Sequence, residues 1–264
     1  MRHKKVRAKK SLGQHFLKDE DVCARIAGVL TGEGYDKILE VGPGMGVLTK
    51  HLVKAGKELH LVELDRDSVA YLKVHYPELA PRLIEGDFLK LDLEDHFKDQ
   101  FAIIGNYPYN ISSQILFKMV ENRHLIPEGG GMFQKEVAKR VASGPGSKVY
   151  GVISVLIQAY YDVEYCFTVP PEVFNPPPKV DSGVIRLRRK ENYQLACNEK
   201  LFRTVVKMAF SQRRKTLSNA LKPLVKDPTL KAMDIMRLRA ERLSVDDFVK
   251  LTNQIESQII PAED

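Results

Sequence analysis

Four short apolar runs, separated by turns and by stretches of helical spacing, leave few folds open to this chain. The runs are continuous rather than alternating, and each is closed by glycine, an acidic residue or asparagine; they occupy residues 37–42, 58–64, 82–86 and 101–106. Continuous hydrophobicity is typical of strands buried on both faces, as in a parallel sheet covered by helices. Helical candidates lie between the strands at 46–55 and 66–75, so the order predicts a doubly wound α/β sheet. Candidates for further strands are residues 129–134, 162–169 and 183–188.

The pattern changes in the last part of the chain, where helical spacing replaces the short apolar runs. Apolar residues recur every three or four positions between 199 and 210, which is typical of an amphipathic helix. Ser244 followed by Asp247 resembles the capping box at the start of another helix. We therefore expect an α/β domain with a basic N-terminal arm over residues 1–195 and a small all-helical domain over residues 196–264.

Positive charge is concentrated in two segments of an otherwise acidic chain. The net charge is +7, from 41 lysines and arginines and 34 acidic residues. Residues 1–10 carry +6 and residues 186–222 carry +9, which leaves −8 on the rest of the chain. Concentrated positive charge attracts polyanions by counterion release, which makes nucleic acid a candidate partner. A solubilising tail together with a solvated helix face is the alternative interpretation.

Several classes of protein are disfavoured by what the sequence lacks. No apolar run approaches the roughly 18 to 20 residues that span a bilayer, and the basic N-terminus lacks the apolar core of a secretory signal. The three cysteines, Cys23, Cys166 and Cys197, form no CxxC pair, which argues against a zinc site and a disulfide framework. We expect a cytoplasmic, monomeric protein that binds no membrane and no metal.

A glycine-rich segment directly follows the first predicted strand. Gly42, Gly44 and Gly46 permit a tight strand-to-helix turn and a close approach of the backbone to a ligand. Their spacing is GxGxG and not the GxGxxG of dinucleotide sites, because position 47 is valine. A pyrophosphate site is therefore not indicated, and by itself the segment is equally compatible with a structural turn.

Acidic residues end the next two predicted strands. Glu63 lies 21 residues after Gly42, where a carboxylate can accept both hydroxyls of a ribose. Asp87 and Phe88 end the third strand and can bind an adenine by a hydrogen bond to its amino group and by stacking. Glu63 and Asp65 are also compatible with capping of the next helix. An adenosine that needs no phosphate contact indicates S-adenosyl-L-methionine as the cofactor.

The fourth predicted strand ends in the tetrapeptide Asn106-Tyr107-Pro108-Tyr109. This tetrapeptide resembles the NLPY form of the motif of ribosomal RNA adenine N6,N6-dimethyltransferases. The Asn106 side-chain oxygen and the backbone carbonyl near Pro108 can accept the two N–H bonds of an exocyclic amine and stabilise the charge that develops on it. Pro108 fixes the backbone, and Tyr109 offers a π-face to the base. A proline turn with Asn106 as a helix N-cap is the structural alternative.

The resemblance to this family extends over nearly the whole chain and keeps the order of its motifs. The matching segments are residues 11–17, 41–49, 62–67, 85–88, 170–182 and 210–217. The resemblance implies a Rossmann-like methyltransferase domain that uses S-adenosylmethionine, followed by the small helical domain. In bacterial members the substrate is two adjacent adenines near the 3′ end of small-subunit ribosomal RNA, so a 30S subunit precursor is the implied partner. The family usually has leucine at position 107, and we expect the tyrosine found there to pack beside the site.

The resemblance also assigns roles to individual residues. The cofactor would contact a set drawn from the N-terminal arm and the strand ends: Gln14, His15, Leu17, Gly42, Gly44, Glu63, Asp87, Phe88 and Asn106. Asn106, Pro108 and Tyr109 would hold the target amine and its base, and Phe174 would cover the other face of the base. A basic helix in the C-terminal domain would contact RNA through Arg213, Arg214 and Lys215.

Two other functions fit parts of the same pattern. A related enzyme could direct the same chemistry at large-subunit ribosomal RNA, as the macrolide-resistance methyltransferases do. Residues 176–182 and the basic segment at 210–217 favour the small-subunit branch instead. A non-catalytic RNA-binding or ribosome-assembly factor could retain the fold, but the intact tetrapeptide at 106–109 and the intact cofactor set argue against loss of catalysis.

Overall fold

The computed structural model describes residue 9 and residues 13–259, and the chain divides into two compact units. The first unit contains the described residues up to Lys139 together with Asp162–Arg189. The second contains Arg140–Tyr161 and the described residues from Lys190 onward. The basic arm predicted at residues 1–10 lies outside the described residues except for Lys9.

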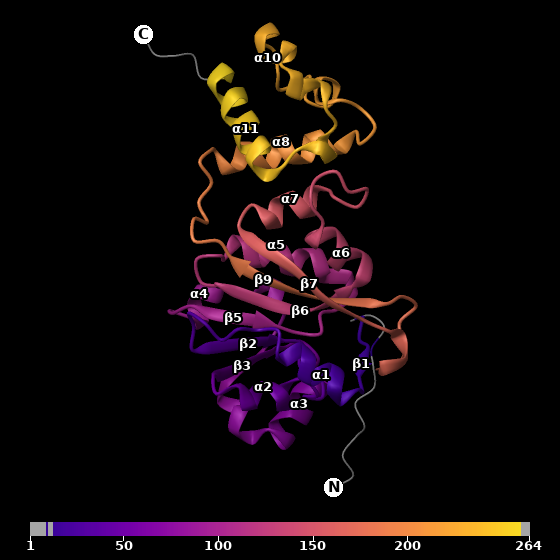
Figure 1. The fold of residues 1–264 in the computed structure, drawn as a ribbon. Helices are drawn as coiled ribbons and strands as arrows, with labels where there is room; N and C mark the ends of the chain where they lie inside the picture. Colours follow the sequence, from indigo (N-terminus) through magenta and orange to yellow (C-terminus); the bar gives the residue numbers. More distant parts are fainter. Residues whose placement is uncertain (1–8, 10–12, 260–264) are drawn as a thin grey trace. The chain divides into compact units, whose positions relative to one another are not determined.

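Within the described residues, the first unit is built on a seven-stranded sheet with the strand order β4-β3-β2-β5-β6-β9-β7 (Figure 1). Strands β2 to β6 are parallel, and β9 pairs with β6 in the antiparallel direction. The bounds are β2 Lys37–Val41, β3 Glu58–Glu63, β4 Leu83–Glu85, β5 Phe101–Ile104, β6 Glu128–Gln134, β7 Tyr161–Val169 and β9 Ser182–Arg189. All four predicted runs form strands, and the predicted α/β fold is confirmed. All four residues of β5 are fully buried, which explains why its sequence is apolar without alternation.

Helices cover both faces of this sheet. Figure 1 shows α1, α2 and α3 on one side and α5 on the other. The helices are α1 Glu20–Ala27, α2 Thr49–Leu52, α3 Arg66–His75, α4 Leu93–His96, α5 Ser112–Glu121 and α6 Lys135–Ala142. Short 3-10 helices occupy η2 Val53–Ala55, η3 Pro77–Arg82, η4 Phe88–Lys90, η5 Tyr109–Ile111 and η6 Pro171–Val173. The apolar faces of α1, α2 and α3 pack on the sheet through buried side chains such as Ile26, Leu52 and Leu72.

A second, two-stranded sheet pairs residues 16–17 with a later segment of the same unit. Strand β1 (Phe16–Leu17) pairs antiparallel with β8 (Phe174–Asn175), so that Leu17 lies opposite Phe174. The amide of Lys18 extends the pairing by donating to the carbonyl of Val173 at 2.8 Å. This pairing could not be predicted from the sequence, because strands of two residues have no detectable periodicity.

The second unit is helical. It contains α7 Val152–Gln158, α8 Glu199–Ser211, α9 Leu217–Ala220, α10 Pro228–Ala232, η7 Asp234–Arg237, η8 Ala240–Arg242 and α11 Val245–Ile259. The amphipathic helix predicted at 199–210 is confirmed, and Phe202, Val205 and Val206 of its apolar stripe are fully buried. The predicted capping box is also present, since the amide of Ser244 donates to the Asp247 carboxylate at 2.9 Å and the amide of Asp247 donates to the Ser244 hydroxyl at 3.1 Å.

The two compact units do not share the limits of the two predicted domains. Residues 140–161, which include α7, group with the C-terminal helices and not with the sheet. The assignment of separate roles to residues 1–195 and 196–264 stays a prediction. In the part of the chain that the structure describes, no helix combines the length and the apolar character needed to cross a bilayer.

Candidate functional site

A pocket opens in the first unit where the carboxyl ends of β2, β3 and β5 meet. Parallel strands present their carboxyl ends at one edge, which is where ligands bind in open α/β sheets. Most of the predicted site residues line this pocket: Gln14, His15, Leu17, Gly42, Gly44, Glu63, Asp87, Phe88, Asn106, Pro108 and Tyr109. Phe174 is not among the lining residues. Among the described residues, no group of three or more histidines, cysteines or acidic residues is arranged to hold a metal ion.

The glycine loop after β2 exposes its backbone to the pocket. Gly42 and Gly44 have φ values of 70° and 58°, in the left-handed region that favours glycine. A Cβ atom added to Gly42 would meet no other atom within 4 Å, so this side of the loop is open to a ligand. At Gly44 a Cβ would lie 3.1 Å from the ring of Phe16, which leaves no room for a larger residue without movement of the arm. The loop therefore fits a ligand that lies directly against its backbone.

Glu63, at the end of β3, is held by the loop and by its own turn. One carboxylate oxygen accepts the amide of Gly44 at 3.0 Å, and the other accepts the amide of Asp65 at 2.8 Å. Burial raises the pKa of this carboxyl, which is only 5 % exposed. Each carboxylate oxygen has a second lone pair, so both can still accept a ribose hydroxyl. The capping alternative applies to Asp65, whose side chain accepts the amide of Asp67 at the start of α3, and not to Glu63.

Asp87 and Phe88 lie in the turn after β4. One carboxylate oxygen of Asp87 accepts the amide of Leu89 at 3.0 Å and thereby caps η4. The other oxygen is available to a ligand amino group, so Asp87 can be both a cap and a pocket residue. The ring of Phe88 is 4 % exposed and lines the pocket floor. Leu64 also lines the pocket and is 52 % exposed, a large apolar side chain that the sequence analysis missed.

Asn106 is fixed by its backbone and by its side chain. Its backbone forms a bridge to Met132, and the next amide, that of Tyr107, donates to the Met132 carbonyl at 3.1 Å. The Asn106 side-chain nitrogen Nδ2 donates to the carbonyl of His15 at 3.0 Å. The His15 carbonyl can accept a hydrogen bond only from the NH₂ end of the carboxamide. This contact therefore turns Nδ2 toward His15 and Oδ1 away from it. The N-cap alternative for Asn106 is wrong, since Ile111 is the N-cap of α5.

Tyr107 packs beside the site, as expected, and its hydroxyl has a structural role that was not expected. The side chain is 1 % exposed, its hydroxyl donates to the carbonyl of Gly130 at 2.9 Å, and its ring contacts Phe133 at a centroid distance of 4.7 Å. Glycines make room for this ring, because Cβ atoms at positions 105 and 131 would lie 3.0 and 2.6 Å from it. Tyr107 therefore anchors the Asn106–Tyr109 segment to β6.

The two aromatic residues predicted to enclose the base occupy different surroundings. Tyr109 lines the pocket, its ring stacks with that of His15 at a centroid distance of 5.6 Å, and its hydroxyl shares a hydrogen bond of 2.5 Å with the Ser182 hydroxyl. Phe174 is 1 % exposed and belongs to the core cluster beside Leu17. The structure does not bring the Phe174 ring into the pocket, and its contact with the base stays a prediction.

Residues 13–17 line the pocket, and Lys9 and His15 make contacts that hold this end of the chain against later segments. The ammonium of Lys9 pairs with Asp65, whose side chain is 1 % exposed, and with Asp67 at 2.8 Å. Ring atom Nδ1 of His15 lies 2.8 Å from the carbonyl oxygen of Pro176. The first residues of the matching segment, 11 and 12, lie outside the described residues, whereas residues 13–17 line the pocket.

The predicted RNA-binding residues lie in the second unit, in the turn after α8. The expectation that they lie on a helix was wrong, because α8 ends at Ser211. Arg213 donates to the carbonyls of Lys148 and Tyr150 at 2.5 and 2.7 Å, so it ties the loop before α7 to this turn. Arg214 and Lys215 are exposed, and RNA binding by all three residues stays a prediction.

The pocket lies at the edge of a Rossmann-like sheet and is formed by the glycine loop, the two strand-end acids and the Asn-Tyr-Pro-Tyr segment. This arrangement is that of a methyltransferase. Residues 5–257 match the family model described as "Ribosomal RNA adenine dimethylase", and the chain belongs to this family.

Relatives and solved structures agree with the family assignment. The chain is 56 % identical over 254 residues to the Ribosomal RNA small subunit methyltransferase A of Flavobacterium johnsoniae, with 96 % of this chain and 97 % of the relative covered. The protein of the same name from Bacteroides thetaiotaomicron is 55 % identical, with 97 % of each chain covered. A dimethyladenosine transferase from Plasmodium falciparum is similar in structure, with a TM-score of 0.80, 26 % identity, and 93 % of this chain and 99 % of that chain covered. The 23S rRNA methyltransferase ErmE shares the fold, with a TM-score of 0.71, 23 % identity, and coverage of 91 % and 99 %.

Proposed function

We propose that this protein uses S-adenosyl-L-methionine to dimethylate the N6 amines of two adjacent adenines near the 3′ end of small-subunit ribosomal RNA, during assembly of the 30S subunit. The orientation of the Asn106 carboxamide is the observation that carries the chemistry, because it leaves Oδ1 as an acceptor at the pocket. The small-subunit substrate is supported by the relatives, which at 55–56 % identity are named for methylation of that RNA.

The pocket residues fit S-adenosylmethionine in their number, kind and order. The open backbone at Gly42 suits a ligand that lies against the loop, and the two carboxylate oxygens of Glu63 suit a ribose. Asp87 and Phe88 suit an adenine, whereas the loop has no lysine or arginine that would indicate a phosphate. When bound, S-adenosylmethionine supplies a methyl group that its sulfonium makes electrophilic.

The residues of the Asn106–Tyr109 segment would act on the target amine. An exocyclic amine is a weak nucleophile, because its lone pair is delocalised into the ring. Asn106 Oδ1 would accept one N–H bond, and the Pro108 carbonyl would accept the other. This carbonyl already accepts the amide of Ile111 at 3.2 Å and lies 3.4 Å from the Ser112 hydroxyl, which has the Tyr109 carbonyl at 3.1 Å as a closer acceptor. These bonds would orient the nitrogen and stabilise the positive charge that grows on it as the methyl–sulfur bond breaks and the N–C bond forms, which leaves the cofactor as a neutral thioether. After transfer, one amine proton leaves to solvent.

The target adenine would have to leave its stack to reach this pocket. Enzymes that act on a base in nucleic acid use splayed or flipped nucleotides, and Tyr109 provides a stacking surface in the pocket lining. The positive charge on residues 186–222 would supply affinity for the flanking phosphates rather than choice of base. Because its substrate is ribosomal RNA, we propose that the enzyme is cytoplasmic, and we expect it to act as a monomer.

The proposal is tested by incubating the protein with methyl-labelled S-adenosylmethionine and, separately, immature small subunits, naked small-subunit RNA and large subunits, followed by mapping of the modified adenines. We expect two adjacent dimethylated adenines in the small-subunit substrates. Label in large-subunit RNA alone would assign the chain to the other branch of this chemistry. Cofactor binding without label in any RNA would favour the non-catalytic assembly factor.

A further inference from the structure

Helix α5 begins beside the Asn106–Tyr109 segment and also contacts the turn that follows Asp87. It begins three residues after Tyr109, and its side chain Lys118 reaches the turn that follows Asp87. The Lys118 ammonium donates to the carbonyl of Leu89 at 3.1 Å and to the carbonyl of Leu91 at 2.5 Å. It also lies 5.5 Å from the centroid of the Phe88 ring, within the range of a cation–π interaction.

These contacts place a charged donor beside a turn that is also held by backbone hydrogen bonds, from the amides of Lys90 and Leu91 to the Asp87 carbonyl at 2.9 and 3.2 Å. An ammonium group has three N–H donors, and here two of them satisfy carbonyls of the same turn. Partial burial lowers the pKa of Lys118, and the nearby carboxylates of Glu121, Asp92 and Asp87 act in the opposite direction. As an ammonium group, Lys118 gives these hydrogen bonds the added strength of a charged donor.

The turn held by Lys118 is the part of the pocket that would recognise a base. Gly86, Asp87, Phe88 and Leu89 all line the pocket. One carboxylate oxygen of Asp87 accepts the amide of Leu89, so the position of the Leu89 backbone sets the direction of the other oxygen. A shift of the Leu89 backbone would move both the carboxylate and the Phe88 ring.

We propose that Lys118 is a positioning residue that sets the preference of the pocket for a 6-aminopurine cofactor, by fixing the turn that carries Asp87 and Phe88. The inference rests on the proposed function and narrows its cofactor recognition to one turn and one supporting side chain. A carboxylate oxygen in the right place accepts a hydrogen bond from an amino group at C6, but faces another acceptor if C6 carries oxygen. The preference between the two purines therefore reports the position of Asp87.

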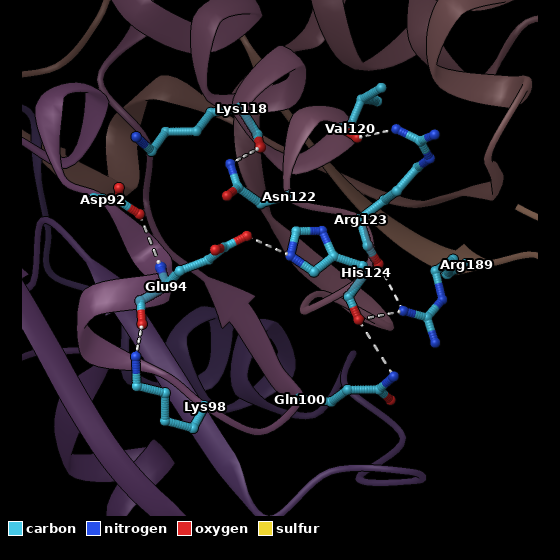
Figure 2. Close-up of polar contacts among 10 residues, drawn as sticks. All are labelled: Asp92, Glu94, Lys98, Gln100, Lys118, Val120, Asn122, Arg123, His124 and Arg189. Carbon is cyan, nitrogen blue, oxygen red and sulfur yellow. Dashed lines mark hydrogen bonds and ion pairs between the residues drawn. The ribbon is translucent and has the colours of Figure 1, made fainter. Parts of the chain in front are cut away.

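The test compares binding of S-adenosylhomocysteine with binding of S-inosylhomocysteine, in which oxygen replaces the amino group at C6. Lys118→Met keeps the aliphatic part of the side chain and removes its donors. The matched control is Lys98→Met, because Lys98 is exposed and also donates to a backbone carbonyl, that of Glu94 at 2.7 Å (Figure 2). Calorimetric titration gives both dissociation constants for each protein, and Lys118→Arg serves as the conservative variant that retains donors.

We expect wild type and Lys98→Met to prefer the adenine ligand by about tenfold or more, the value of one hydrogen bond to a charged acceptor. Lys118→Met should bind S-adenosylhomocysteine about tenfold more weakly than wild type does, whereas its affinity for S-inosylhomocysteine should change little. The preference for the adenine ligand should therefore fall to about threefold or less. Lys118→Arg should retain most of the preference. In methyl transfer, Lys118→Met should raise the KM for the cofactor more than it lowers kcat.

Equal weakening of both ligands by Lys118→Met, or an unchanged preference in a variant with normal thermal stability, would overturn the inference. Either result leaves the proposed function intact, provided that wild type binds S-adenosylhomocysteine and methylates RNA. A wild-type protein that binds neither ligand would refute the proposed cofactor, and with it this assignment of Lys118.

Discussion

Replacing Asn106 with alanine separates methyl transfer from cofactor binding. The substitution removes Oδ1, the acceptor for the target amine, but leaves the backbone of the segment anchored to β6 through Met132 and Tyr107. Loss of one polar group that stabilises charge in the transition state costs about 10²- to 10³-fold in rate, or about 2.7–4 kcal/mol. We therefore expect transfer by Asn106→Ala to fall by at least about 10²-fold.

The effect of Asn106→Ala on cofactor affinity should be smaller and has a separate origin. The variant loses the hydrogen bond from Nδ2 to the His15 carbonyl, which is 3.0 Å long and helps to hold the arm. A hydrogen bond of this kind contributes about 0.5–1.5 kcal/mol, equivalent to about a two- to thirteen-fold change in a dissociation constant. Glu63 and Asp87 are untouched and would still bind the nucleoside.

Single-turnover transfer to small-subunit RNA and titration with S-adenosylhomocysteine measure the two effects. Asn122→Ala is the matched control, since Asn122 also donates from Nδ2 to a backbone carbonyl, that of Lys118 at 2.9 Å, but lies at the other end of α5 (Figure 2). The control should transfer methyl groups at close to the wild-type rate. Transfer by Asn106→Ala within about threefold of wild type would show that Oδ1 does not orient the amine.

Three further predictions concern stability and RNA binding. Tyr107→Leu restores the family's usual residue but removes the hydroxyl bonded to Gly130, so we expect a loss of about 1–3 kcal/mol in the free energy of unfolding, measured by urea titration. Burial raises the pKa of Glu40 from 4.5 to about 8, so the stabilising effect of its protonated form is complete below pH 4.5 and is lost as the pH rises through 8. Glu40→Gln should therefore match wild type in urea titrations at pH 4 and exceed it in stability at pH 8.5; an equal gap at both values would contradict the assignment. Arg213→Ala should lower the melting temperature, because it breaks two hydrogen bonds to backbone carbonyls. Arg214→Ala should leave the melting temperature unchanged and reduce the slope of log affinity for RNA against log salt by about 0.7–0.9. Equal melting temperatures of the two variants would contradict this division of roles.

The sequence was sufficient to predict the sheet and most of the pocket. Buried parallel strands have continuous apolar sequences, and residues at their carboxyl ends meet at one edge, so Glu63, Asp87 and Asn106 could be brought together without coordinates. The contacts between distant segments could not be predicted in this way. In the sequence Lys118 resembles any other surface cation, and Arg213 was expected only to contact RNA. The folded backbone shows that each of them donates to two carbonyls.

Local pattern also failed where packing decides the role of a residue. Tyr107 could be noticed as a departure from the family, but its bond to Gly130 depends on Gly105 and on Gly131 in β6, which make room for its ring. Phe174 matches a family segment, yet its pairing opposite Leu17 places it in the core. In both cases the side chain's surroundings come from a strand far away in the sequence.

The bond between Asn106 and the His15 carbonyl has a consequence for the timing of dimethylation. Two transfers to one nitrogen need two cofactor molecules, and residues 13–17 line the pocket that the spent cofactor must leave. Movement of this arm would withdraw the His15 carbonyl and release the carboxamide, so the amine-binding geometry would be rebuilt once for each methyl group and not once for each RNA. We therefore expect monomethylated adenine to be a discrete kinetic intermediate in a rapid-quench time course. Its lifetime should be set by the return of residues 13–17 to the pocket, and a higher RNA concentration should not shorten it.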